Sequence, residues 1–384
     1  MKTLYLYCQE VNKPKLLQSI IEDRKETILA KLNAPSSGNL NALFSTKEAQ
    51  NIIGKHPSKN LPPHYFIIEK SAQNTFGCLL SCWTEFEIFR TIQNSVRSAK
   101  EYTNNNLNTY STQTINEHYC YEIVPDIALD TRLFHTNFSE QPLLLSDAIV
   151  LINIATFIKE HQWYEMLTLL DISSKGEHYI LYQLDEGNAY PSIISSALIN
   201  SPHVSNEWLF FNDFFQNEKW QSIHQPHTVS NLQQATKGLI KLDDAHLSNK
   251  SSNDIENHLF SSIVDSKKVC EAIRLTVSGN KSKANFHLYL AQKGLANALK
   301  QSGREVVFTI IEKPAMVLFY QSMNLEAPMS SPYLFTSAQD INKNGVVTYK
   351  GIWLLNNATD AFNQYNFKEY NVKIIGLRKL SRHN

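Results

Sequence analysis

Two charged residues on one apolar run carry the clearest chemical signal in the chain. Glu271 and Arg274 lie three residues apart within Val269–Val277, and such a run predicts a strand. A carboxylate can take a proton from an attacking amine, and a guanidinium can hold a carboxylate with two parallel hydrogen bonds. Residues three apart on a regular strand point to opposite faces, so a shared pocket requires a bulge. A solvent-exposed Glu and Arg flanking a strand is the alternative.

Other candidate side chains lie in a loop and in an aromatic segment. Ser278, Lys281 and Lys283 precede a predicted helix, where backbone amides and positive charge favour a phosphate or an acidic carrier protein. Exposed lysines without a specific role are the other reading. Trp208 and Phe211 belong to an aromatic segment that could line a slot for an alkyl chain. A core aromatic cluster explains them equally well.

An ordered series of elements positions these residues. We expect strand, loop, helix, strand and helix over Val269–Val277, Ser278–Ser282, Phe286–Ser302, Arg304–Ile311 and Ala315–Met323. Gly303 stands where a helix ends, and Pro314 stands where the next one begins. Closing strands are predicted at Tyr333–Phe335 and Val346–Leu355. The last third of the chain is therefore a sheet with helices packed on it.

The preceding residues divide into two regions. Residues 1–140 form an N-terminal α/β region of unassigned role, with helices at Lys15–Leu32 and Ala42–Ile53 and strands at His64–Lys70 and Phe76–Trp83. Residues 141–384 form the second domain, which opens with a helix or helix pair between Leu143 and Met166. An antiparallel meander should follow, with strands at Leu167–Ile172, Tyr179–Leu184 and Tyr190–Ile199.

Composition limits the partners of this 384-residue chain. Lys plus Arg and Asp plus Glu number 36 each, so no overall field attracts nucleic acid or an anionic membrane. The longest apolar stretch, Ala148–Ile158, is too short to span a bilayer.

Met1–Cys8 lacks the features of a signal peptide, so a cytoplasmic location is expected. The five scattered cysteines should be reduced, and Cys78 and Cys82 lack a second ligand pair, so no metal is expected.

The series from Val269 onward resembles the GNAT superfamily of N-acyltransferases. The last run, Glu312-Lys313-Pro314-Ala315 through Tyr320 to Asn324-Leu325, is similar to the family's strand end, polar residue, short helix and tyrosine. The resemblance implies a mixed, mostly antiparallel sheet flanked by helices, of α/β (α+β) class. It assigns Tyr320 as general acid for a departing thiol, and it implies a substrate-binding role for Glu312. An aromatic at a core edge is the competing reading of Tyr320.

Glu271-Ala272-Ile273-Arg274 narrows the resemblance. A Glu-x-x-Arg on this strand is similar to the acyl-homoserine-lactone synthases, whose acyl-CoA loop is likewise degenerate, as it is in Val277–Lys283 here. The chain length resembles that of the LuxM and AinS group of these autoinducer synthases. The family's early acidic positions fall near Asp171, which the resemblance makes a candidate substrate-binding residue.

The resemblance implies acyl transfer from acyl carrier protein or acyl-CoA to the amine of S-adenosylmethionine. Lactonisation then releases methylthioadenosine, and the product serves quorum sensing. No cofactor is implied beyond these two substrates. Glu271 would be the base or orient it, and Glu271→Gln is expected to preserve the fold while lowering turnover by orders of magnitude. A GNAT-type transferase acting on another small amine, or a non-catalytic binding protein, are the alternatives.

Overall fold

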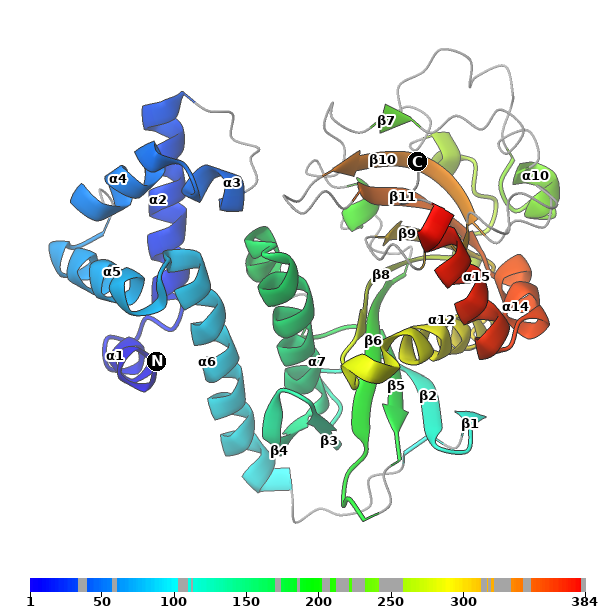
Figure 1. Ribbon diagram of the computed structural model, residues 1–384. Helices are drawn as coiled ribbons and strands as arrows, with labels where there is room; N and C mark the ends of the chain where they lie inside the picture. Colours follow the sequence, from blue (N-terminus) through cyan, green and yellow to red (C-terminus); the bar gives the residue numbers. More distant parts are fainter. Residues whose placement is uncertain are drawn as a thin grey trace. The chain divides into compact units, whose positions relative to one another are not determined.

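The structure is a computed structural model (Figure 1). It describes residues 1–33, 40–56, 61–102, 110–111, 113–169, 174–184, 187–201, 208–211, 221–222, 232–241, 258–311, 316, 319–320, 333–340 and 347–380. The chain forms two compact units. Unit 1 consists mainly of Met1–Asn108 and Ala128–Lys175, and unit 2 mainly of Thr109–Ile127, Gly176–Ile341 and Gly345–Asn384. No described helix is long and apolar enough to cross a membrane.

Unit 1 is mostly helical. Its described helices are α1 Lys2–Glu10, α2 Leu16–Leu32, α3 Leu40–Phe44, α4 Lys47–Lys55, α5 Pro63–Phe76, α6 Leu79–Tyr102 and α7 Leu145–Asn153. A π-helical turn, η1 Ile154–Lys159, continues α7, and the 3-10 helix η2 Tyr164–Leu169 follows. Its described residues also form a hairpin of β3 Leu133–Thr136 and β4 Ser139–Leu144.

The strands expected at His64–Lys70 and Phe76–Trp83 are wrong, because these residues lie in α5 and α6. Tyr65, Glu69 and Ala72 are buried at spacings of four and three, which is the period of a helix face. The Glu69 carboxylate accepts a hydrogen bond of 2.6 Å from the guanidinium of Arg24 on α2. The apolar run of α5 is thus one face of a helix that also buries an ion pair.

A strongly curved, mixed sheet forms the centre of unit 2. Its described strands are β1 Thr114–Asn116, β2 Tyr119–Val124, β5 His178–Gln183, β6 Ser192–Asn200, β7 Gln221–Ser222, β8 Val269–Val277, β9 Val306–Ile311, β10 Tyr333–Asp340 and β11 Val347–Leu354. They lie in the order β1-β2-β5-β6-β8-β9-β11-β10-β7. Among these described pairs, β8 with β9 is parallel and the others are antiparallel. This confirms the predicted mixed, mostly antiparallel sheet.

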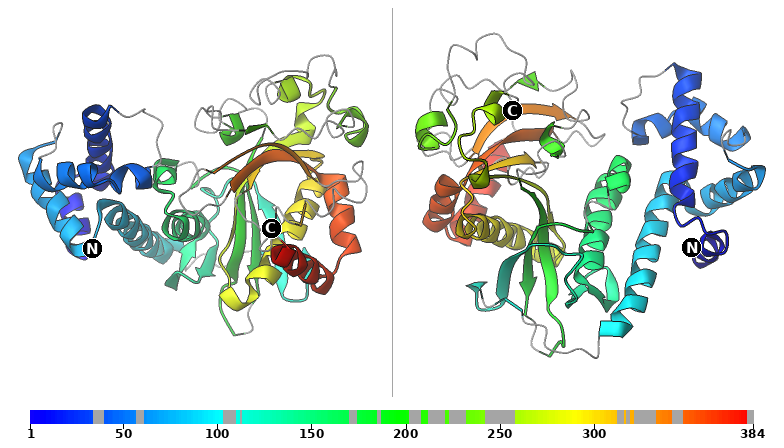
Figure 2. Two further views of the ribbon diagram at one scale, coloured as in Figure 1. Left: turned by 45° about the horizontal axis from the view of Figure 1, so that its top comes forward. Right: turned by 180° about the vertical axis from the view of Figure 1, so that it is seen from behind.

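Helix α12, Ala284–Gln301, connects the parallel strands β8 and β9, as a parallel pair requires a crossover. It packs on one face of the sheet together with α14, Leu355–Gln364, and α15, Phe367–Leu380 (Figures 1 and 2). The predicted inward residues of α12 are buried: Leu288, Ala291, Leu295, Ala298 and Leu299. A Cβ at Gly294 would lie 2.2 Å from the Tyr179 hydroxyl oxygen, so glycine allows the close approach of α12 to β5.

Short elements complete the described part of unit 2: η4 Leu209–Phe211, α10 Leu232–Ala235, η7 Ser266–Lys268 and η8 Lys281–Lys283. The second and third strands of the predicted meander are confirmed as β5 and β6, which pair in antiparallel register. The first is wrong at residues 167–169, which belong to the 3-10 helix η2. Within the predicted helix Ala315–Met323, Met316, Phe319 and Tyr320 are helical, and the rest lies outside the described residues.

Candidate active site

A bulge interrupts β8 at Arg274. Ser196 of β6 pairs with Thr276, and Leu198 pairs with Ile273. Between these two pairs the chain advances three residues along β8 but only two along β6. Arg274 has φ +58°, a conformation that bends the strand and is unusual for a side chain other than glycine. The bulge required for a shared Glu271 and Arg274 site is therefore present.

Strands β8 and β9 separate just beyond Ala272. They pair from Val269 with Val306 to Ala272 with Thr309. Further along, β8 continues to pair with β6, and β9 with β11, where Ile311 lies opposite Tyr349. The sheet consequently has a gap between its two parallel strands, next to the bulge.

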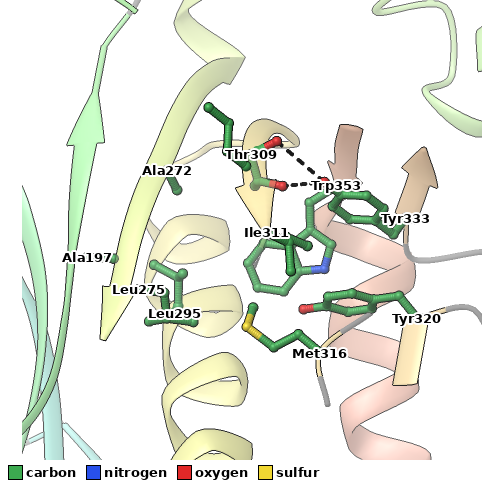
Figure 3. A pocket seen from close by; sticks show the side chains of 11 residues that line it. Ala197, Ala272, Leu275, Leu295, Thr309, Ile311, Met316, Tyr320, Tyr333 and Trp353 are labelled. Atoms are coloured by element: carbon green, nitrogen blue, oxygen red, sulfur yellow. Dashed lines mark hydrogen bonds between the residues drawn. The ribbon is translucent and has the colours of Figure 1, made fainter. Parts of the chain in front are cut away.

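A cavity of about 30 Å³ lies at this gap (Figure 3). Ala197, Ala272, Leu275, Leu295, Thr309, Ile310, Ile311, Met316, Tyr320, Tyr333 and Trp353 line it. The lining is apolar apart from a few groups, and Thr309 Oγ1 and the Tyr333 hydroxyl are hydrogen-bonded to each other at 2.6 Å. The cavity is on the α12 face of the sheet, since Leu295 belongs to that helix. Such a space suits an uncharged, mostly apolar group.

Glu271 faces the other side of the sheet. Its neighbour Ala272 lines the cavity, and successive side chains on a strand alternate in direction. The Glu271 side chain is fully buried, and its carboxylate accepts three hydrogen bonds. Asn200 Nδ2 and the Leu209 amide donate to Oε2 at 2.6 and 3.1 Å, and the Phe210 amide donates to Oε1 at 2.6 Å.

Burial raises the pKa of Glu271 to about 7, against the opposing effect of these hydrogen bonds and of Arg274. Burial likewise lowers the pKa of Arg274 to about 10, while the charge of Glu271 opposes that shift. The guanidinium stays charged at neutral pH, and the carboxyl group exchanges its proton near neutral pH. The structure thus brings Glu271 and Arg274 into one electrostatically coupled, buried pair.

His178 adds a titratable group that the sequence did not reveal. It lies on β5 opposite Leu198 of β6, which in turn lies opposite Ile273. Its Nδ1 is 3.0 Å from the Gly176 carbonyl oxygen, and burial, with a smaller contribution from Arg274, lowers its pKa to about 4. Its only sequence signal is a polar residue at an otherwise buried strand position, which is too common to identify a site.

Tyr320 lies against the cavity and is 1% exposed. Its ring stacks on Tyr333 with centroids 5.3 Å apart. Gln292 Nε2 donates to the Tyr320 hydroxyl oxygen at 3.5 Å, and the Tyr370 hydroxyl donates to Gln292 Oε1 at 3.1 Å. Burial raises the pKa of Tyr320 well above its usual range, so its hydroxyl keeps its proton at neutral pH.

The three candidate residues in the loop after β8 differ in their exposure to solvent. The Ser278 hydroxyl is buried and donates within unit 2 toward the Ile193 carbonyl oxygen at 3.0 Å. Lys281 and Lys283 are exposed and precede the first turn of α12. Asn280 caps this segment by accepting from the Ser282 amide at 2.9 Å. The two lysines are free to meet a solvent-borne phosphate, whereas Ser278 holds the loop against β6.

Trp208 and Phe211 belong to a buried cluster away from the described cavity. Their rings are stacked at 6.1 Å, and Trp208 lies 5.6 Å from Phe308 of β9. Neither residue lines the cavity. The cluster supports the turn whose Leu209 and Phe210 amides bind Glu271. Asp171 and Glu312 lie outside the described residues, and among the described residues no three His, Cys, Asp or Glu could together hold a metal ion.

Comparisons with known proteins identify the family of the chain. The acyl homoserine lactone synthase family model matches residues 2–383. The chain is 31% identical to the acyl-homoserine-lactone synthase OpaM of Vibrio parahaemolyticus serotype O3:K6 (strain RIMD 2210633), covering 95% of this chain and 88% of the relative. It is 29% identical to the acyl-homoserine-lactone synthase LuxM of Vibrio harveyi, covering 97% and 90%. No solved structure matched. The expected family is confirmed: the chain belongs to the acyl-homoserine-lactone synthases.

Proposed function

We propose that the chain transfers an acyl group from a thioester to the α-amine of S-adenosylmethionine and then closes a homoserine lactone for quorum sensing. The family and the names of its relatives support this activity. The carrying observation is the gap between β8 and β9, with an apolar cavity on one face and Glu271 with Arg274 on the other. We assign the reaction to the cytoplasm, because both substrates are products of cytoplasmic metabolism.

The reaction consists of two bond exchanges. The amine nitrogen attacks the thioester carbonyl carbon, a C–N bond forms, the C–S bond breaks, and the amine proton passes to a base. The methionine carboxylate oxygen then attacks the carbon attached to the sulfonium. A C–O bond closes the lactone, the C–S bond breaks, and its electron pair neutralises the sulfonium of the departing methylthioadenosine.

Glu271 is placed to receive or relay the amine proton. Its Oε2 accepts two hydrogen bonds and its Oε1 accepts one from described residues, and an ionised carboxylate offers about four acceptor positions. Among the described residues, one acceptor position is therefore left for an amine or for a water that relays its proton. A pKa of about 7 is close to the optimum for a general base at neutral pH.

Arg274 is assigned to the S-adenosylmethionine substrate and Tyr320 to the thiol that leaves the acyl donor. Arg274 keeps its charge beside Glu271, which suits it to hold the methionine carboxylate. Tyr320 is on the cavity side, where a thiol would depart. Because its pKa lies well above 10 and an ordinary thiol titrates near about 8.5, Tyr320 stabilises the leaving sulfur by a hydrogen bond rather than by giving up its proton.

Lys281 and Lys283 are assigned to the acyl donor. Their exposed charges precede an 18-residue helix, whose N-terminus favours a phosphate. Acyl carrier protein and acyl-CoA both present one through phosphopantetheine, and the acidic surface of the carrier would add long-range attraction. Replacing both lysines by Glu should raise KM for either donor. If this increase in KM is larger with the carrier protein than with acyl-CoA, and if it becomes smaller when salt is added, the carrier protein is the physiological donor.

A product assay tests the proposed function. Purified full-length chain is incubated with S-adenosylmethionine and a panel of acyl-carrier-protein and acyl-CoA thioesters, and mass spectrometry follows methylthioadenosine and acyl lactone. Equal amounts of both products are expected. Tyr320→Phe should lower kcat about tenfold or more through loss of one hydrogen bond to developing charge. Amide formation on other amines without methylthioadenosine would instead show a different acyltransferase, and no thioester consumption would show a binding protein.

A further inference from the structure

Three buried polar side chains form a hydrogen-bond network that connects α15 with Tyr320. Gln292 of α12 is fully buried, and Tyr370 of α15 and Tyr320 are each 1% exposed. The Tyr370 hydroxyl donates to Gln292 Oε1 at 3.1 Å, and Gln292 Nε2 donates to the Tyr320 hydroxyl oxygen at 3.5 Å. Two helices that are consecutive on neither side of the cavity in sequence are thus joined to one candidate catalytic hydroxyl.

The order of donors in this network sets the direction of the Tyr320 proton. A glutamine amide has one oxygen that accepts and one NH₂ group that donates. Because Tyr370 gives its proton to the amide oxygen, the NH₂ group is the part that faces Tyr320. The Tyr320 oxygen accepts there, and its own proton has no acceptor among the described residues. That proton is left to point into the cavity that Tyr320 lines (Figure 3).

Ring packing holds the Tyr370 end of the network in place. The Tyr370 ring lies 4.8 Å from the ring of Phe319 and 5.2 Å from that of Tyr289, measured between centroids. Phe319 directly precedes Tyr320, so the same packing also supports the segment that carries the hydroxyl. With both rings held, the orientation of the Gln292 amide decides whether Tyr320 accepts or donates on that side.

We propose that Gln292 and Tyr370 are positioning residues that hold the Tyr320 hydroxyl as a donor toward the sulfur of the departing thiol. This inference rests on the proposed function and deepens it by adding α15 to the site. A hydrogen bond to sulfur is strongest as the C–S bond breaks and negative charge collects there. A reversed amide would take the Tyr320 proton and turn a lone pair of the hydroxyl toward that charge. The bond from Tyr370 opposes this reversal.

The proposal predicts a dependence on the thiol that leaves. A thiolate of lower pKa leaves faster and needs less help. An alkyl thiolate such as that of N-acetylcysteamine, which has the structure of the end of phosphopantetheine, therefore depends more on a donor than the less basic thiolate of thiophenol. A purely structural role for Gln292 or Tyr370 would lower the rates with both thioesters by the same factor.

Two thioesters of one acyl group, one with each thiol, test this dependence. For the full chain with saturating S-adenosylmethionine, kcat/KM is measured from methylthioadenosine release, and the alkyl value is divided by the aryl value. Tyr320→Phe should lower this ratio about tenfold. Tyr370→Phe, which keeps the ring, and Gln292→Met, which keeps the length, should each lower it at least about threefold. Equal losses with both thioesters in these two variants overturn the proposal.

Tyr289→Phe is the matched control. It removes a buried hydroxyl of α12 that donates to the Tyr365 carbonyl oxygen at 2.7 Å, outside the network, so the ratio should stay that of the wild type. A ratio that falls as far as in Tyr370→Phe overturns the assignment.

A double variant tests whether Tyr370 acts through Tyr320. Added to Tyr320→Phe, Tyr370→Phe should not lower the ratio further, because coupled residues are not additive. A further fall of about threefold contradicts the network. Absence of methylthioadenosine from the wild type with these thioesters and with acyl-CoA rejects the proposed function itself. Wild-type turnover with ratios that no network variant changes rejects only this inference.

Discussion

At Glu271, one carboxylate binds donors from two separate segments of the chain. Asn200 is on β6, and the Leu209 and Phe210 amides belong to a turn about 60 residues away in sequence. The side chain that the sequence makes a candidate base therefore holds the turn carrying Trp208 and Phe211. Any replacement of Glu271 tests a structural tie and a catalytic role together.

Glu271→Gln should consequently lower stability. A Gln side chain offers one oxygen and one NH₂ group, so at least one of the two backbone amides would face a donor instead of an acceptor. We expect a loss of about 1–3 kcal/mol in the free energy of unfolding, with the fold itself preserved. Urea denaturation measures it. Glu305→Gln is the matched control, since its partly exposed pair with Lys268 should contribute about 1 kcal/mol or less. Equal losses would contradict the assignment.

The pH dependence of activity follows from the same residue. A base must be ionised, so kcat/KM should rise as pH increases through about 7, the pKa of Glu271, and level off above it. The substrate amine adds its own rise near about 8. Rates of methylthioadenosine release between about pH 5.5 and about pH 9 would show both rises. The residual activity of Glu271→Gln should show only the rise near about pH 8. If the variant keeps the pH profile of the wild type, Glu271 is not the base.

Sequence alone made Glu271 and Arg274 candidates because a carboxylate and a guanidinium on an apolar strand are chemically conspicuous. Their partners could not be found in the same way. The Leu209 and Phe210 amides carry no side-chain signature, and His178 reaches the site only through the pairing of β5 with β6.

At the scale of elements, the bulge in β8 allows two candidate residues three apart to act together. Arg274 is the extra residue, so Ala272 and Leu275 both line the cavity although three positions separate them. A regular strand would turn Leu275 away from it. The alternation resumes after the bulge, which keeps the rest of β8 in register with β6.

Substitution at Arg274 tests this conformation. Its positive φ is costly for any residue with a Cβ, so Arg274→Gly should be more stable than Arg274→Ala by about 1 kcal/mol. Chemical denaturation of both variants gives the difference, which is independent of the lost guanidinium. At Thr276 in the same strand the order should reverse, with Ala more stable than Gly. Finding Ala more stable at both positions would argue against the bulge.

Secondary structure was predicted best where a segment repeated its apolar pattern over many residues and a glycine or proline marked its end. Helix α12 has 18 residues and ends before Gly303, and its inward face followed from spacing. The short apolar run around Ile67 and Ile68 predicts a strand as readily as a helix, because four or five apolar residues fit either structure. Burial of Glu69 with Arg24 decides for a helix, and that pairing joins segments 45 residues apart.

At the scale of the molecule, the chain enters unit 2 before it completes unit 1. Residues 109–127 provide β1 and β2, and β2 pairs with β5 along six residues, from Tyr119 opposite Gln183 to Val124 opposite His178. A division of the chain at residue 140 therefore separates β5 from its neighbouring strand.

A fragment of residues 141–384 should be poorly soluble. Without β2, the buried residues Tyr179 and Leu181 would lie on an unpaired edge strand, which favours aggregation. Expression of the fragment beside the full chain, with centrifugation and size-exclusion chromatography, measures the soluble fraction. A soluble, monomeric and active fragment would show instead that residues 141–384 fold independently.

The gap between β8 and β9 has a kinetic consequence. With the proposed acyl cavity on one face of the sheet and Glu271 on the other, the proposed sites leave each substrate its own approach. Binding should follow random order, and initial-rate lines at several fixed concentrations of the second substrate should intersect. A non-reactive analogue of each substrate should compete with that substrate alone. Parallel lines would mean that the acyl group leaves its carrier before the amine arrives.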